Sequence, residues 1–218
     1  MDDKLKILVK VMLPALKDSL YMTFWASLCA CIIGFFLAVI LVTTAEDGLT
    51  PNKVVYRVLN VVVNICRSFP FIILAVTIMP LTRIVMGTSI GVTAALFPLT
   101  LVASPFVARI LEGNLKVVDP GMIEAAKSFG ASNLQIIFKI MLKEAIPSMC
   151  ISVTVVVISV LGSSAMAGAI GAGGLGQVAL SYGYQRYDEF VMYTTVIILA
   201  ILVQLLQTIG NVLYTRLK

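Results

Sequence analysis

The chain has 218 residues, of which 60% are hydrophobic and 12% are charged, and its mean hydropathy is +1.03. A soluble domain usually carries about 25% charged residues, so these values exclude an ordinary soluble protein and indicate several membrane spans. The net charge of +5 comes without a solvated basic domain that could hold nucleic acid, and the absence of histidine excludes Ser-His proteolysis and histidine-ligated metal or haem sites.

Residues 1–18 are predicted to form an amphipathic helix at the membrane interface, interrupted at Pro14. Their four lysines are spread through an apolar pattern, and no small-residue cleavage site follows a compact apolar core. This arrangement excludes a cleavable signal peptide. Residues 19–218 are predicted to form a single transmembrane domain.

Stretches almost free of charge mark five transmembrane helices. A hydrocarbon core about 30 Å thick needs about 20 helical residues, and each stretch is long enough. The second span must contain Arg67, because residues 68–82 alone would reach only about 22 Å. The expected fold is an all-α integral membrane protein. Its predicted spans cover residues 19–45, 58–82, 84–108, 145–166 and 190–215.

The positive-inside rule orients these spans, because basic residues favour the cytoplasmic side. Six basic residues are predicted to lie on one side of the membrane: the four N-terminal lysines, Arg83 and Arg186. The other side is therefore predicted to be cytoplasmic, with the N-terminus outside and the C-terminus inside. Its nine cations are Lys53, Arg57, Arg109, Lys116, Lys127, Lys139, Lys143, Arg216 and Lys218.

The cytoplasmic connection between the third and fourth spans, residues 109–144, contains a predicted short helix. Asp119 can cap this helix at its start, Pro120 suits its first position, and Gly130 can close it. One apolar face is predicted from Ile123, Ala126 and Phe129.

A second helix is predicted after this glycine. Ser132 and Gln135 have capping-box spacing, and the apolar pattern continues toward Pro147. Periodicity alone leaves open whether the helix pair lies on the membrane surface or docks on a partner protein.

The same loop resembles the EAA loop of ABC importer permeases, because Glu124-Ala125-Ala126, Gly130 and Ile140-Met141-Leu142 occur at that motif's spacing. The resemblance implies a coupling helix that docks into a groove on a cytoplasmic ATPase subunit. Glu124 could accept hydrogen bonds from that partner or favour the positive end of its own helix. One departure is Lys143, where the family usually has proline, so the helix could continue unbroken to Pro147. The implied coupling residues are Ile123, Glu124, Ala125, Ala126, Phe129, Gly130 and Ala131.

Four further segments resemble the permease family of bacterial D- and L-methionine importers: residues 67–74 (RSFPFIIL), 87–91 (GTSIG), 104–109 (SPFVAR) and 164–177 (SAMAGAIGAGGLGQ). The similarity runs from about Thr23 to the C-terminus. It implies a type I ABC importer permease that works as a homodimer, with two copies supplying ten helices around a path on the symmetry axis. The implied partners are two ATPase subunits, a second copy of the chain, an extracytoplasmic substrate-binding lipoprotein and membrane lipid.

Candidate residues for the translocation path come from charges and breaks within the spans. Arg67 is the only charge well inside a span, and it either serves the path or has a structural role, snorkelling or bonding carbonyls freed near Pro70. Met166 either narrows the path or packs. No charged substrate pocket is evident from the sequence. The path candidates are Arg67, Ser68, Pro70, Ser104, Pro105 and Met166.

The sequence indicates no catalytic site, no metal site and no cofactor of its own. The chain lacks a G-x-x-x-x-G-K-[ST] motif, so ATP and Mg²⁺ are expected on the partner subunit. Four cysteines lie in apolar segments and are expected to pack as small hydrophobes. Residues 171–176 spell G-x-G-x-x-G, but their transmembrane flanks favour a turn or close helix packing over dinucleotide binding.

These observations predict the permease subunit of an ABC importer in the bacterial inner membrane, with methionine as substrate. A permease for another amino acid is an alternative. An ATP-independent channel or secondary transporter is a second alternative, but apart from Arg67 the spans contain no ionisable residue that could bind a coupling ion. A membrane-embedded enzyme is disfavoured, because histidine and paired acidic residues in a span are both missing.

Overall fold

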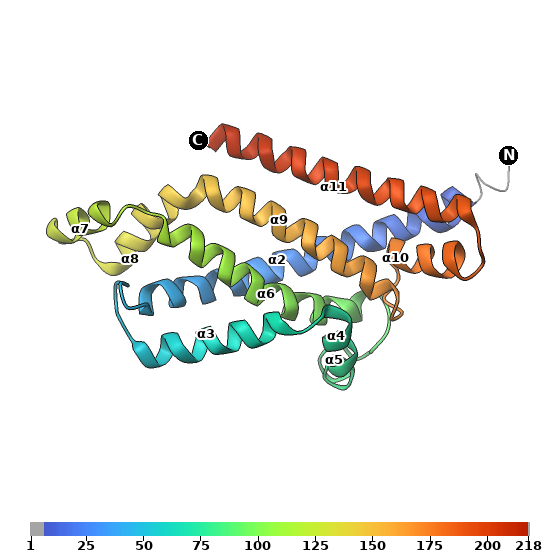
Figure 1. Cartoon of the computed structure of the whole chain (residues 1–218), viewed down its shortest axis with the longest axis horizontal. Coiled ribbons are helices and arrows are strands. Elements are labelled where there is room, and N and C mark those ends of the chain that lie inside the picture. The colour runs from blue at the N-terminus through green and yellow to red at the C-terminus, as the bar shows by residue number, and fades with distance from the viewer. Residues whose placement is uncertain (1–6, 218) are drawn as a thin grey trace.

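The computed structural model describes residues 7–217 as an elongated helical bundle. The long helices run along one axis, with α7 and α8 at one end and the start of α2 at the other (Figure 1). The elements are η1 (Leu8–Met12), α2 (Leu13–Thr44), α3 (Lys53–Ser68), α4 (Phe71–Thr77), α5 (Met79–Met86), α6 (Val92–Lys116), α7 (Pro120–Ser128), α8 (Asn133–Gln135), η2 (Ile136–Met141), α9 (Leu142–Gly168), α10 (Gly174–Val178), η3 (Ala179–Tyr184) and α11 (Glu189–Leu217); η marks π-helical segments.

Five segments of the described chain are long and apolar enough to cross a membrane. Four are continuous helices: Leu8–Thr44, Val92–Lys116, Asn133–Gly168 and Glu189–Leu217. The fifth is the pair α3 and α4, which is bent by 102° at a short break. The all-α, five-span prediction is therefore confirmed, with the second span broken rather than straight.

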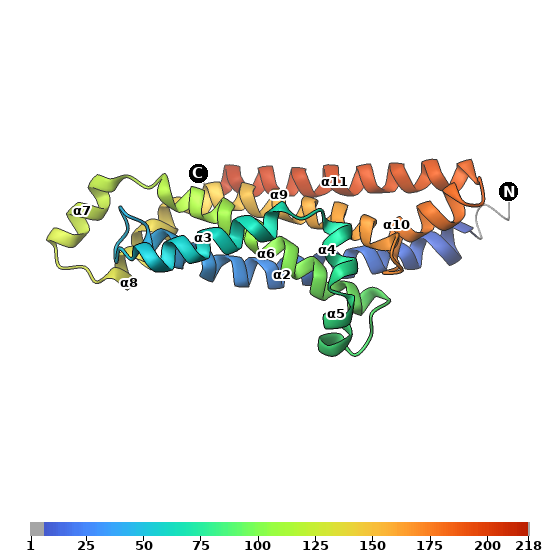
Figure 2. The same cartoon turned by 60° about the horizontal axis from the view of Figure 1, so that its bottom comes forward.

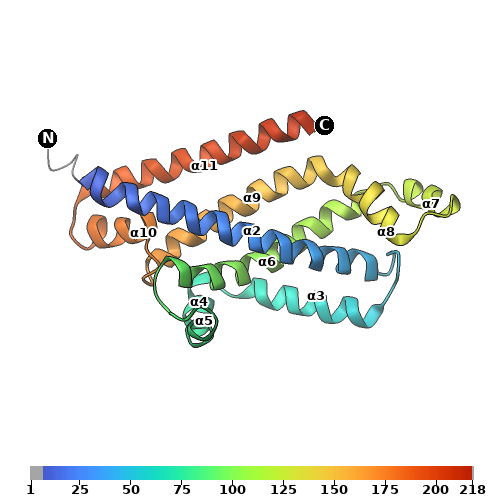
Figure 3. The ribbon, with the colours of Figure 1, turned by 180° about the vertical axis from the view of Figure 1, so that it is seen from behind.

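The most extensive helix contact joins α2 to α6 along a row of small residues, and Figure 3 shows the two helices crossing along the bundle. Ala26, Ala30, Gly34 and Ala38 recur every four residues and are buried. A Cβ atom on Gly34 would stand 2.5 Å from Cβ of Val107. Small residues at this spacing let two backbones approach closely, which favours association in lipid.

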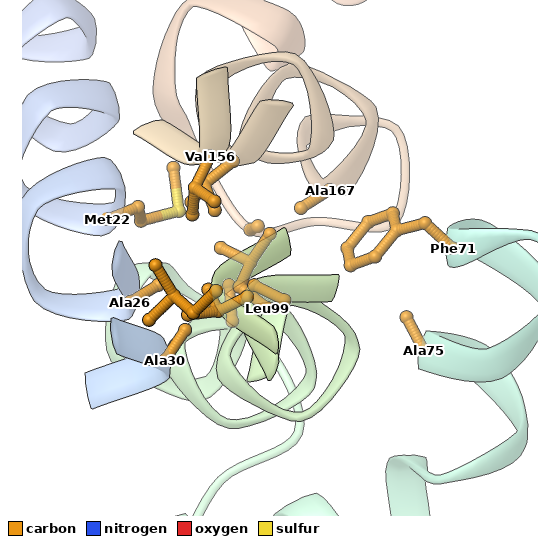
Figure 4. Close-up of a cluster of buried hydrophobic side chains, with 14 of the residues drawn as sticks. Met22, Ala26, Ala30, Phe71, Ala75, Leu99, Val156 and Ala167 are labelled. Atoms are coloured by element: carbon orange, nitrogen blue, oxygen red, sulfur yellow. The ribbon is translucent and has the colours of Figure 1, made fainter. Parts of the chain in front are cut away.

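The largest buried cluster joins this seam to α9 and α4. Met22 on α2, Leu99 on α6, Val156 on α9 and Phe71 on α4 all point into it (Figure 4). In contrast, α11 is largely exposed in the isolated chain, with 6% of its apolar window buried. Lipid or another protein must therefore cover most of α11.

The N-terminal prediction is wrong in the part that the structure describes. Pro14 does not interrupt the helix: it lies inside the continuous helix Leu8–Thr44, directly after the π-helical segment η1. Local π-helical adjustment is one way in which membrane helices accommodate proline. Met12 and Ala15 pack against Leu175 and Val191 instead of lying on lipid. Residues 7–18 therefore belong to the first span, and residues 1–6 lie outside the described residues.

The predicted continuous second span, residues 58–82, is also wrong. Its first helix α3 begins at Lys53, where the Asn52 side chain accepts hydrogen bonds from two backbone N–H groups. The helix stops at Ser68 because Pro70 disfavours the α conformation at Phe69, which is extended with ψ 132°. Beyond Pro70 the chain turns into α4 and then α5, which projects sideways from the bundle (Figure 2).

The third span is shifted from residues 84–108 to α6. Gly87 and Gly91 have positive φ angles of 76° and 101°, and a loop between them separates α5 from α6. At its other end α6 continues to Lys116 instead of stopping at residue 108. The predicted loop of residues 109–144 is therefore shorter than expected at its N-terminal side.

The fourth span is longer than residues 145–166, because α8, η2 and α9 form one continuous helix from Asn133 to Gly168. Pro147 lies inside it without ending it. Pro147 cannot donate to the carbonyl of Lys143, a residue on the exposed face of the helix, while Met141 and Ala145 remain buried against the bundle on both sides of that turn. The fifth span, α11, contains the predicted residues 190–215.

The glycine-rich block after α9 combines a turn with close packing. Gly171, Gly173 and Gly174 have positive φ angles, and the carbonyl of Gly171 accepts a hydrogen bond from the N–H of Gly91. A Cβ atom on Gly176 would collide with the backbone of Ala165. The block therefore folds α10 back against α9, and neither of its flanks is a strand.

We expect Gly34→Ala to lower the free energy of unfolding by about 1–3 kcal/mol, because the added methyl group must push α2 away from α6. Denaturant unfolding of the purified protein in detergent measures this change. Gly162→Ala is the matched control, since a Cβ atom at Gly162 meets nothing within 4 Å. Equal stability of the two variants would contradict the close contact.

Candidate functional site

Residues 119–131, called the elbow here, form a short helix and a glycine turn at one end of the bundle (Figure 1). The Asp119 side chain accepts a hydrogen bond of 2.8 Å from the N–H of Gly121, and Pro120 occupies the first position of α7. Gly130 has a φ of 78° and donates its N–H to the carbonyl of Lys127. The predicted start and end signals of this helix are confirmed.

The face of the elbow that packs on the bundle contains only part of the predicted apolar face. Ala126 is buried, and Ile123 and Ala131 pack with it against a cluster formed by α6, η2 and α9. Phe129 does not join them: its side chain is 92% exposed. Phe129 is the C-cap residue of α7, at the point where the helix ends and the chain turns through Gly130.

The outer face of the elbow therefore combines an exposed aromatic ring with small and charged residues. Glu124, Ala125 and Lys127 are exposed around Phe129. The Ser128 hydroxyl donates a hydrogen bond of 3.0 Å to the carbonyl of Glu124, which fixes the last turn. Such a surface presents an apolar anchor with a polar surround, the usual composition of a protein-binding patch.

The helix that follows the elbow attaches it rigidly to the membrane domain. Ser132 and Gln135 form the predicted capping box in both directions, at 3.3 and 2.9 Å. Ile136 and Met141 of η2 are buried in the same cluster as Ala126. Displacement of the elbow therefore moves the continuous helix from Asn133 to Gly168.

A buried carboxylate at the base of the elbow was missed by the sequence analysis. Glu112 is only 2% exposed, and its carboxylate lies 2.8 Å from Nη1 of Arg109 and 2.7 Å from Nζ of Lys116. The Tyr56 hydroxyl of α3 lies within 3.4 Å of the same carboxylate. The i, i+3 and i+4 spacing of these charges on one helix was the available signal.

Arg109 extends this network across to α3. Its Nη2 donates to the side-chain carbonyl oxygens of Asn60 and Asn64, the latter at 2.9 Å. Lys116 also stands 5.4 Å from the centre of the Tyr56 ring. These contacts clamp α3 to the last turns of α6. Leu115 in the last turn of α6 also belongs to the cluster in which Ala126 of the elbow is buried, so the clamped helix end contacts the elbow.

The structure does not bring the predicted path residues together. Ser104 and Pro105 are buried on α6, and Ser104 lies on the side that meets Gly34 of α2. The Ser68 hydroxyl donates to the carbonyl of Asn64, and Pro70 is exposed at the break before α4. Met166 is 52% exposed in the last turn of α9.

Arg67 lines a pocket of about 310 Å³ between α3, α6 and α9, and none of the other candidates lines this pocket. Two serines of α9 that the sequence analysis did not select, Ser159 and Ser163, line it as well. Within residues 7–217, no group of three or more Cys, Asp or Glu side chains is placed to hold a metal ion.

Comparison with known proteins gives a family and several relatives. Residues 42–218 match the family described as binding-protein-dependent transport system inner membrane component. The chain is 48% identical over 206 residues to a probable D-methionine transport system permease protein of Vibrio cholerae, which covers 94% of this chain and 92% of that protein. It is 42% identical over 174 residues to the methionine import system permease protein of Bacillus subtilis, covering 80% and 78% of the two chains.

A solved structure is similar over the whole length. The permease-like chain of the MetNI methionine ABC transporter in an inward-facing conformation superposes with a TM-score of 0.95 at 40% identity. The match covers 100% of this chain and 99% of that chain. The bend at Pro70 and the elbow both lie within the matched region.

Replacing Glu112 tests the clamp. We expect Glu112→Ala to lower the free energy of unfolding by about 3 kcal/mol, because it leaves Arg109 and Lys116 without their shared partner. Denaturant unfolding in detergent measures it. The control is Glu46→Ala, which breaks an exposed pair with Lys53 and should change stability by no more than about 1 kcal/mol. Equal effects of the two substitutions would show that the clamp adds no stability.

Proposed function

The chain belongs to the family of binding-protein-dependent transport system inner membrane components, and we propose that it is the methionine-translocating permease subunit of an ABC importer. It is a multi-pass protein of the bacterial inner membrane and not an enzyme. The observation that supports methionine as the substrate is the similarity to methionine permeases over more than nine-tenths of the chain. ATP hydrolysis is the work of a separate subunit, which binds the ATP and Mg²⁺.

The elbow is the part of this chain that contacts the ATPase. Ile123, Ala126 and Ala131 hold the elbow on the bundle, and Gly130 closes it. Glu124, Ala125 and Phe129 remain on the outer face for the partner. Phe129 is the anchor, because an aromatic ring that touches little of its own chain gains most apolar burial when a groove covers it.

A second copy of the chain completes the path. Five spans are few for an enclosed path, and α11 leaves most of its surface without contacts in the isolated chain. A twofold dimer provides ten helices with the path on the symmetry axis, two elbows and two ATPase subunits. An extracytoplasmic binding lipoprotein delivers the substrate at the opposite end.

The positions of the elbow, the first span and the last span along the bundle support the predicted orientation of the chain in the membrane. The elbow contacts a cytoplasmic ATPase, so its end of the bundle is cytoplasmic. The first span begins at the opposite end, and α11 runs back toward the elbow end (Figure 1). The N-terminus is therefore outside and the C-terminus is cytoplasmic, in agreement with the distribution of basic residues.

Transport follows an alternating-access cycle. ATP binding closes the two ATPase subunits, and their grooves carry the two elbows toward each other. The elbow leads into the helix Asn133–Gly168 and packs on its first turns, and α6, which precedes the elbow, is joined to α3 through Glu112. These helices follow the movement, and the path opens to the outside. Hydrolysis reverses the movement.

Phe129→Ala tests this docking. We expect the variant to retain ATPase subunit at least about tenfold less well during purification, because the anchor of the contact is lost. Thermal unfolding of the permease alone should be unchanged, since the side chain is 92% exposed. Ile84→Ala, at an 80% exposed position on α5, should retain the ATPase normally. Normal retention by Phe129→Ala would contradict the proposed role of the elbow.

A further inference from the structure

The Arg67 pocket combines one charge, two hydroxyls and an apolar wall. Arg67 comes from the last turn of α3, about 21 Å along that helix from Lys53, so it lies deep within the span. The volume of the pocket, about 310 Å³, is at the lower end of the range for small-molecule sites. The remaining lining residues are Leu99, Val102, Ala103, Phe106, Ser159, Val160 and Ser163.

The polar side chains of this pocket have no protein partner. Many hydroxyls in the spans donate to a carbonyl of their own helix, as Thr154 does to Cys150 and Ser164 does to Leu161 on α9, although Thr23 and Ser27 on α2 are buried without a partner. Within residues 7–217, Ser159 and Ser163 on that helix make no such hydrogen bond, and Arg67 makes neither a hydrogen bond nor an ion pair. The carbonyls freed near Pro70 therefore do not hold Arg67.

An unpaired guanidinium inside a span is costly and requires an anion or water. None of the lining residues is acidic, so the chain itself offers no counter-charge in this pocket. The buried Glu112 shows the contrast: it already has two cations and a tyrosine around it, at the other end of α3. Water, or an anion that comes from outside this chain, must therefore compensate the charge of Arg67.

We propose that the Arg67 pocket is a transient binding site for the transported amino acid, a role that rests on the proposed function. The guanidinium of Arg67 forms a two-point ion pair with the α-carboxylate. The free hydroxyls of Ser159 and Ser163 accept hydrogen bonds from the α-ammonium group. The thioether side chain lies against the apolar wall, where sulfur is well suited to the edge of the Phe106 ring.

This composition also suits a translocation step. A permease site must bind strongly enough to admit the substrate and weakly enough to release it. One ion pair and two neutral hydrogen bonds, in a pocket on whose rim Arg67 remains exposed, meet both conditions. The site is also coupled to the ATPase, because its walls are formed by α3, α6 and α9. α9 belongs to the helix that follows the elbow, and α3 is joined to α6 through Glu112.

Photolabelling of the assembled transporter tests the site. The complex of permease, ATPase and binding protein is reconstituted in vesicles and loaded with a methionine analogue that carries a diazirine in its side chain. We expect adducts on α6 between Leu99 and Phe106, and competition by free methionine. Methioninol, which has the ammonium group but no carboxylate, should fail to compete.

Substitution of Arg67 supplies the decisive comparison. Arg67→Met should reduce labelling and ATP-driven methionine uptake by about tenfold or more, because the charge-assisted hydrogen bonds to the carboxylate are lost. Arg67→Lys keeps the charge and should restore part of both. Arg83→Met is the matched control, since Arg83 is an exposed arginine on α5 outside the pocket, and it should label and transport normally.

The outcomes separate this inference from the proposed function. If the wild-type complex imports methionine but Arg67→Met labels and transports equally well, the inference is overturned and the proposed function stands. Competition by methioninol as effective as that by methionine would also overturn it, because carboxylate recognition would then be absent. Labelling displaced by an anionic phospholipid but not by methionine would assign Arg67 to a lipid headgroup instead. Failure of the wild-type complex to import methionine would overturn both proposals.

Discussion

The close contact between α2 and α6 is the constraint on which the rest of the structure depends. Hydrocarbon surrounds the spans, so apolar burial alone gives little reason for one helix to prefer another. The row of small residues at Ala26, Ala30, Gly34 and Ala38 supplies that preference, because it lets the backbones approach until Gly34 meets Val107 and the carbonyl of Ser104. With α6 fixed in this way, the other helices have a rigid surface on which to pack.

Three functional regions then lie along the length of α6. Its first residues follow the loop that bonds to the glycine block through Gly91 and Gly171. Its middle forms the apolar wall of the Arg67 pocket, and its last two turns hold Glu112 and lead into the elbow. α6 runs as one continuous helix through all three regions, with Pro98 and Pro105 inside it. It therefore links the end next to the elbow directly to the pocket.

The polar groups within the spans fall into two classes, and the difference has functional meaning. Most are satisfied within the chain: Glu112 is surrounded by Arg109, Lys116 and Tyr56, and Ser104 donates to the carbonyl of Thr100. Others have no partner in the described chain: the buried hydroxyls of Thr23 and Ser27 on α2, and Arg67, Ser159 and Ser163, which line one pocket. A charge and two hydroxyls without protein partners, gathered around one pocket within the spans, indicate a site whose partner arrives from outside.

Hydropathy determined the number of spans from the sequence alone, and local signals determined the elbow, because Asp119, Pro120, Gly130 and the Ser132–Gln135 box act within a few residues. The span boundaries were less accurate, since Pro14 and Pro147 lie inside continuous helices without ending them. Which polar groups pair with one another could not be predicted from the sequence. Whether Phe129 is exposed, whether Glu112 joins α3 and whether Arg67 shares a pocket with two serines depend on how distant segments pack; Tyr56 and Glu112, for example, are 56 positions apart in the chain. Only the tertiary structure decides such contacts, because they follow from how the helices pack and not from the composition of any one helix.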